Sequence, residues 1–157
     1  MKPDIKELNN TDLWVEYIKI HKELEKRKLI NPNNIIGRYG EFLALEIYNS
    51  SKKLPNLKIN TDIESKINAL NSKKERYVIK TILEPSNRTS VFYVDDKKVF
   101  DYVIIVHIAK DYKLIRMVEL TWEQFLKFRK WNNLLRGWSI SITEFLLKEA
   151  KIVSKFK

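Results

Sequence analysis

The side chains of this chain that can do chemistry are carboxylates, amides and amines. The sequence contains no cysteine, and its only histidines are His21 and His107. Thiolate sites and histidine-rich zinc sites are therefore excluded. Any bound metal must be held by oxygen ligands, which suits a hard cation such as Mg²⁺. His107 stands in a strongly apolar run, which favours a buried structural histidine over a general base.

Three segments carry such groups in one order along the chain: Gly37–Ala44, Ile67–Asn71 and Arg76–Lys80. The first resembles the first-helix motif of the PD-(D/E)XK nuclease superfamily, in which a Gly-Glu pair starts a helix whose glutamate reaches toward the metal site. Glu41 fills that place. The other two segments resemble the superfamily's β-hairpin, whose second strand ends in an apolar residue and a lysine, here Ile79-Lys80. The spacing from Asn68 to Lys80 is similar to that of restriction-endonuclease-like members, and the resemblance covers roughly residues 35 to 145.

This resemblance implies a fold and a site. The implied fold is α/β, with a central mixed β-sheet flanked by helices, as in restriction endonucleases. The implied cofactor is Mg²⁺, or Mn²⁺ in its place, which polarises a phosphodiester and generates hydroxide while a cation stabilises the developing charge. The expected catalytic residues are Lys80, Glu41 and Asn68. The expected metal ligands are Glu41, Asp62, Glu64 and Asn68.

Two positions depart from the superfamily's pattern. Asn68 stands where the metal-binding aspartate is expected, and Val78 stands where an acidic residue or glutamine is expected. An amide is a poorer ligand for a hard cation than a carboxylate, and valine offers none. Asp62 or Glu64 could supply the missing charge through a shift in register. Two functions therefore remain open: a metal-dependent endonuclease that cuts duplex DNA, or a pseudo-nuclease that binds DNA or serves as an assembly module.

The balance of charge favours a polyanionic partner. With 30 Lys and Arg against 20 Asp and Glu, the net charge is +10, and double-stranded DNA is the expected partner. Composition alone also permits a basic protein-interaction module. The expected DNA contacts are Arg38, Lys73, Lys74, Arg76, Arg129, Lys130 and Arg136. Aromatic residues lie between the later cations, and of these we expect Trp122 and Phe128 to be core residues.

The periodicity of apolar residues predicts the elements that position these groups. One helix is expected over residues 10–29, with Thr11 as N-cap. A second helix is expected from about Ile36 to about Tyr48. Strands are expected over residues 57–60, 76–83, 90–94, 101–108 and 112–120, with the all-apolar run Val103–Val106 in a central strand. A capping box at Thr121 predicts a helix to about Trp131. A strand over 138–142 and a helix capped by Ser141, continuing through Ile152, complete the order.

The length of 157 residues fits a single domain over 1–157, with an N-terminal helix at 10–29 and a nuclease-like core at 33–157. No apolar run is long enough for a membrane span, and the N-terminus lacks the apolar core of a secretory signal. We therefore expect a cytoplasmic protein without a membrane partner. A homodimer would match the two-fold symmetry of many DNA sites.

Overall fold

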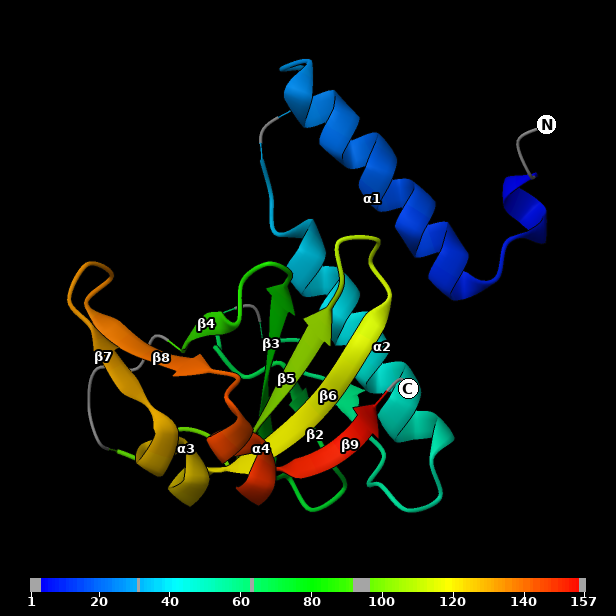
Figure 1. Ribbon diagram of the computed structural model, residues 1–157. Coiled ribbons are helices and arrows are strands. Elements are labelled where there is room, and N and C mark those ends of the chain that lie inside the picture. Colours follow the sequence, from blue (N-terminus) through cyan, green and yellow to red (C-terminus); the bar gives the residue numbers. More distant parts are fainter. Residues whose placement is uncertain (1–3, 31, 63, 92–96, 156–157) are drawn as a thin grey trace. The chain divides into compact units, whose positions relative to one another are not determined.

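The computed structural model describes residues 4–30, 32–62, 64–91 and 97–155. The chain divides into two compact units, one up to Tyr39 and one from Gly40 onward. The first unit contains a short 3-10 helix (Ile5–Glu7), α1 (Asn10–Lys26) and the start of α2 (Ile35–Ser50) (Figure 1). The side chain of Asn9, rather than the predicted Thr11, caps α1 by accepting a hydrogen bond from the backbone of Asp12.

The second unit is built on a six-stranded mixed sheet with the order β1-β2-β3-β5-β6-β9 (Figure 1). Its strands are β1 (Lys58–Ile59), β2 (Ala69–Leu70), β3 (Arg76–Leu83), β5 (Tyr102–Ile108), β6 (Leu114–Thr121) and β9 (Lys151–Lys155). β3 and β5 are parallel, and the other neighbouring pairs are antiparallel. β5 lies inside the sheet, and Val103–Val106 are completely buried, as the apolar run predicted.

A second sheet of three strands belongs to the same unit. It has the order β4-β8-β7, formed by β4 (Arg88–Val91), β8 (Gly137–Ser141) and β7 (Lys130–Asn132). Together with α3 (Trp122–Phe128) and α4 (Glu144–Glu149) it covers one face of the large sheet. Val78 and Val103 from that face share a core with Phe125, Ile140 and Leu146 from the covering elements.

The opposite face of the large sheet carries α2. Tyr48 of α2 packs against Tyr77 of β3 with ring centroids 6.2 Å apart. Its hydroxyl donates a hydrogen bond of 2.5 Å to Oε2 of the buried Glu119 on β6. The sheet is thus covered on both faces, and the predicted mixed α/β architecture with flanking helices is confirmed at this level. No helix within the described ranges is long and apolar enough to cross a bilayer.

Several predicted boundaries are wrong. The first helix ends at Lys26 instead of residue 29, because Lys28 has a positive φ of 59°. The helix that starts after Thr121 ends at Phe128, because Arg129 is extended and the next residues pair with β8. The predicted strand 90–94 is observed only as Arg88–Val91, since residues 92–96 lie outside the described part.

The C-terminal prediction is also wrong. The side chain that caps α4 is Thr143 and not Ser141. Ala150 is extended with a ψ of 148°, and Lys151–Lys155 form β9 instead of continuing the helix through Ile152. β9 pairs with β6, whose other edge is taken by β5. Pairing with a sheet edge therefore outweighs the helical pattern of a short segment that holds Ile152 and Val153.

Candidate functional site at the edge of β3

Close packing of α2 against β3 positions Glu41. A Cβ atom at Gly40 would overlap the Oγ1 atom of Thr81 on β3, so only glycine allows the helix backbone to come this near. Glu41 is the next residue of α2 and is partly buried. The Gly-Glu pair of the sequence motif thus has two physical roles, since the glycine brings the helix to the strand and the glutamate supplies a carboxylate there.

The side chain of Asn68 extends the edge of β3 beyond its partner strand. β2 pairs with β3 only where Ala69 faces Tyr77 and Leu70 faces Arg76. The backbone N–H of Asn68 then donates to the carbonyl of Tyr77 at 2.9 Å. Its side-chain Oδ1 accepts the backbone N–H of Ile79 at 2.8 Å. The Asn68 amide therefore satisfies a strand-edge donor where β2 no longer does.

This contact fixes which way the amide points. Only the oxygen of the Asn68 carboxamide can accept from the Ile79 N–H, so the amide nitrogen must take the other side. There Nδ2 donates to Oε1 of Glu41 at 2.8 Å. The structure thus brings together Glu41 and Asn68, which are 27 residues apart in the sequence. The positive end of an amide dipole lies beside the Glu41 carboxylate.

Lys80 lies within the electrostatic influence of the same carboxylate. Burial lowers the pKa of Lys80 below its usual 10.5, and the positive charge of Lys66 lowers it further, while Glu41 raises it. Alternation along β3 puts Lys80 on the face of Val78, opposite to Thr81, which faces α2. The interaction between Lys80 and Glu41 therefore acts across the edge of the strand, where Asn68 lies.

Neither position 78 nor the other predicted ligands, Asp62 and Glu64, complete a metal cage among the described residues. Val78 is 1% exposed and belongs to the hydrophobic core. Asp62 and Glu64 are exposed, and Oδ1 of Asp62 accepts the backbone N–H of Glu64 at 3.1 Å. Within the described part of the chain, no group of three or more His, Cys, Asp or Glu side chains is arranged to hold a metal ion.

The donors present do not fit Mg²⁺, the cofactor that the resemblance implies. A hard dication prefers several anionic or carbonyl oxygens. Here the oxygen of Asn68 already accepts from Ile79, and its N–H group is directed at Glu41, the side on which a shared cation would lie. Position 78 supplies an apolar side chain. The arrangement can hold a hydrogen-bonded Glu41–Asn68 pair and a nearby ammonium without any metal.

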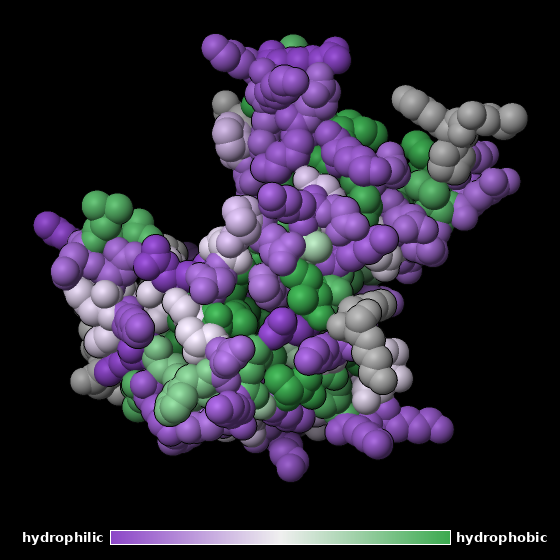
Figure 2. All heavy atoms as spheres, in the orientation of Figure 1, coloured by the Kyte–Doolittle hydropathy of each residue, from purple (hydrophilic) through white to green (hydrophobic). Residues whose placement is uncertain are grey.

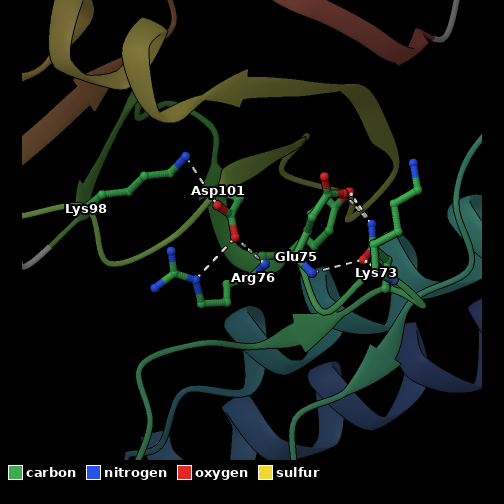
Figure 3. Close-up of polar contacts among 7 residues, drawn as sticks. Lys73, Glu75, Arg76, Lys98 and Asp101 are labelled. Carbon is green, nitrogen blue, oxygen red and sulfur yellow. Dashed lines mark hydrogen bonds and ion pairs between the residues drawn. The ribbon is translucent and has the colours of Figure 1, made fainter.

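The predicted phosphate contacts on the turn between β2 and β3 differ in their availability. Lys73 and Lys74 are exposed. Arg76 is engaged, because its backbone N–H and its Nε donate to Oδ2 of Asp101 at 2.8 and 3.2 Å, and Lys98 contacts Oδ1 of the same carboxylate at 3.3 Å (Figure 3). Burial alone would raise the pKa of Asp101, but these hydrogen bonds lower it overall. Arg76 therefore has a structural role in joining β3 to β5.

The later group of predicted contacts lies around the small sheet. Lys130 on β7 and Arg136 in the β7–β8 turn are exposed. The guanidinium of Arg129 lies 3.8 Å from the ring centroid of Trp138, which is a cation–π contact. Trp122 is buried as predicted, and Phe128 is half-buried against Phe145.

Arg38, the remaining predicted contact, is an exposed residue of the first unit. Two residues of the small sheet region escaped the sequence analysis. Arg88 was outside the predicted strand and Phe145 read as part of an apolar helix face, yet both are exposed. Only the pairing of β4 with β8 shows that Arg88 belongs to this region.

Comparison with known proteins adds no family to this description. No protein-family model matches the chain, and no curated protein matches it.

Proposed function

We propose that this chain is a cytoplasmic protein of restriction-endonuclease-like fold that binds double-stranded DNA and does not cut it. The observation that carries the proposal is the Asn68 amide, which bridges the Ile79 backbone and the Glu41 carboxylate in the place of a metal ligand. The proposal is supported by the hydrogen bond that Nδ2 of Asn68 donates to Oε1 of Glu41. In a pseudo-nuclease, this donor would stand beside the Glu41 carboxylate where an active nuclease would have a cation.

Binding to DNA is supported by the charge of the chain and by where its cations lie. The net charge is +10, and Lys73, Lys74, Lys130 and Arg136 are exposed on turns and edge strands of the second unit. Such groups neutralise phosphates and release counterions, the dominant contribution to DNA affinity. Lys80 adds a partly buried ammonium next to Glu41.

The second candidate is a metal-dependent endonuclease. It is favoured by one observation, that the carboxylate of Glu41 acts on the ammonium of Lys80. A Mg²⁺ or Mn²⁺ ion would polarise the phosphate of the substrate and generate a hydroxide. To hold that ion, the chain would need a second carboxylate beside that of Glu41, and Asp62 and Glu64 are the candidates closest in sequence to Asn68. A homodimer remains a prediction for either function.

The two candidates separate in one experiment. The unaltered chain, Asn68→Asp and Lys80→Ala are each incubated with supercoiled and linear DNA and Mg²⁺ or Mn²⁺, and DNA binding and cleavage are both scored on gels. We expect the unaltered chain to shift DNA without cutting it, and Lys80→Ala to bind less tightly. Metal-dependent cutting by the unaltered chain that Lys80→Ala abolishes would establish the endonuclease instead. If the unaltered chain neither bound nor cut DNA, both candidate functions would be overturned. A protein-interaction module would then remain.

A further inference from the structure

The outward face of the three-stranded sheet is polar and positively charged. In the pairing of β4 with β8, Arg88 lies opposite Ser141, and in the pairing of β7 with β8, Lys130 lies opposite Ser139. Paired residues share a face, and Ile140 between the two serines points into the core. The middle of this face therefore holds small serines, with a cation on the strand at either side.

Two adjoining pockets form a groove over this face, which we name the small-sheet groove. One has a volume of about 370 Å³ and is lined by Lys127, Phe128, Arg129, Lys130, Ser141, Thr143 and Phe145. The other has a volume of about 460 Å³ and is lined by Arg88, Lys130, Trp131, Asn132, Asn133, Leu134, Ser139 and Ser141. Lys130 and Ser141 line both pockets. Among the residues that the structure describes, the side chains lining the two pockets include Lys127, Arg129, Lys130 and Arg88 and no acidic one, so this lining favours an anion.

An aromatic and an aliphatic side chain are exposed beside the small-sheet groove. Phe145, which lines the smaller pocket, is 65% exposed. Trp131 is 42% exposed, but it pairs with Trp138 and therefore lies on the face of Ile140, opposite to Lys130. Leu134, at the tip of the β7–β8 hairpin, is 92% exposed. Figure 2 shows a hydrophobic cluster at this tip among hydrophilic side chains. In proteins that bind single strands, unpaired bases stack on exposed aromatic rings while nearby cations contact the phosphates.

We propose that the small-sheet groove binds a single-stranded segment of DNA. A base stacks on Phe145, and the neighbouring phosphates contact Lys130 and Arg88. A duplex keeps its bases stacked on one another, so it can meet the cations but cannot place a base against Phe145. This inference rests on the proposed DNA-binding function and adds a site and a form of DNA to it.

The test measures fluorescence anisotropy of three labelled ligands of equal length: oligothymidine, an abasic strand with the same phosphates, and a duplex. We expect the unaltered chain to bind oligothymidine more tightly than the abasic strand. Phe145→Ala should weaken oligothymidine binding by a factor of about 5 to 150, as loss of one stacked base implies, whereas Trp131→Ala, which changes the other face of β7, should not. Duplex binding should change by less than about twofold. Both side chains are exposed, so we expect unchanged circular dichroism spectra.

A matched control is Ile152→Ala, which truncates a side chain of similar exposure (44%) on β9. It should leave the affinity for oligothymidine unchanged. Equal binding of oligothymidine and the abasic strand, or full affinity of Phe145→Ala, would overturn the inference. Duplex binding by the unaltered chain would in that case still support the proposed function. Failure of the unaltered chain to bind any of the three ligands would overturn the proposed function itself.

Discussion

Asn68 is the residue on which the interpretation of the site depends. Its amide both accepts from the backbone of Ile79 and donates to the carboxylate of Glu41. An aspartate could make only the first of these contacts, since an ionised carboxylate has no donor. Two carboxylates would then face each other, and they would require a cation or a proton between them.

We predict that Asn68→Asp makes the stability of the protein dependent on metal. Without a divalent ion, the variant should lose about 1–3 kcal/mol of unfolding free energy, because a hydrogen bond is replaced by repulsion. Mn²⁺ should restore it, by about 2.7 kcal/mol at a hundredfold excess over the dissociation constant. Denaturant unfolding with and without Mn²⁺ measures both effects.

Asn49→Asp is the matched control for this change. Asn49 also bridges two groups, since Oδ1 accepts from the backbone of Leu57 at 2.7 Å and Nδ2 donates to the Leu57 carbonyl at 3.0 Å. Its aspartate would lose the same kind of donor without gaining Glu41 as a neighbour, so Mn²⁺ should not restore its stability. Equal metal responses of Asn68→Asp and the unaltered chain would contradict our account of the Glu41–Asn68 pair.

We expect Lys80 to lower the free energy of unfolding while it contributes to the proposed binding of DNA. Burial and Lys66 lower its pKa, so its charged form is disfavoured in the folded state, and this penalty is fully present at pH 7. Lys80→Met should therefore raise the unfolding free energy at pH 7. The gain should shrink as the pH approaches 10.5, the usual pKa, because the lysine then loses its charge.

The same variant should bind duplex DNA less tightly, with a salt dependence shallower by about one unit of log–log slope if Lys80 contacts a phosphate. Urea unfolding at pH 7 and pH 10 and binding at several salt concentrations test the two effects. A less stable Lys80→Met at pH 7 would mean that attraction to Glu41 outweighs the penalty of burial.

The sequence indicated which side chains lie near one another, but not the contacts that they make. Glu41 and Asn68, which the order of the motifs grouped together, are hydrogen-bonded at the edge of β3, and the Glu41 carboxylate acts on Lys80. The sequence could not show that the Ile79 backbone orients the Asn68 amide. That depends on β2 pairing with β3 over only two residues, which no local pattern specifies.

At the level of elements, the contact between α2 and β3 positions Glu41. We predict that Gly40→Ala lowers the unfolding free energy by about 1–3 kcal/mol, because the new methyl group would overlap Thr81 and the helix must move away. Thermal or denaturant unfolding measures this loss. Gly37→Ala is the comparison, because its methyl group would displace only the Asn34 side chain, whose Oδ1 accepts the Gly37 backbone N–H at the start of α2.

Gly37→Ala should lower the unfolding free energy less than Gly40→Ala, because its cost is limited to disturbing the Asn34 hydrogen bond and is partly offset by the helix preference of alanine. The displacement caused by Gly40→Ala should in addition weaken the Glu41–Asn68 contact. If the two alanine variants proved equally stable, close approach of α2 to β3 would not explain the glycine.

Local patterns predicted elements where burial and periodicity agree and failed where pairing decides. β3 was predicted to the residue, and the apolar run of β5 correctly indicated a strand covered on both faces. β7 was predicted as the end of a helix because Phe128 and Trp131 are at helical spacing. β9 was predicted as part of a separate helix that continues from Phe145 to Ile152. Both are edge strands, and each forms by pairing with another strand, β7 with β8 and β9 with β6. The periodicity of apolar residues within a segment does not show such pairing.

At the scale of the whole molecule, the proposed function depends on electrostatic attraction to DNA. The excess of ten positive charges is carried in part by exposed lysines and arginines of the second unit, such as Lys73, Lys74 and Arg136. If about six phosphates are neutralised on binding, the logarithm of the binding constant should fall with the logarithm of salt concentration at a slope of roughly −5. Binding to a protein partner through apolar contacts would give a far weaker dependence.

The most direct measurement is therefore the affinity of the unaltered chain for a short labelled duplex between 50 and 200 mM salt, in buffer that contains Mg²⁺. We predict tight binding at low salt, a steep linear decrease, and duplex that stays intact throughout. Affinity that does not respond to salt, or duplex cut during the titration, would contradict the central claim.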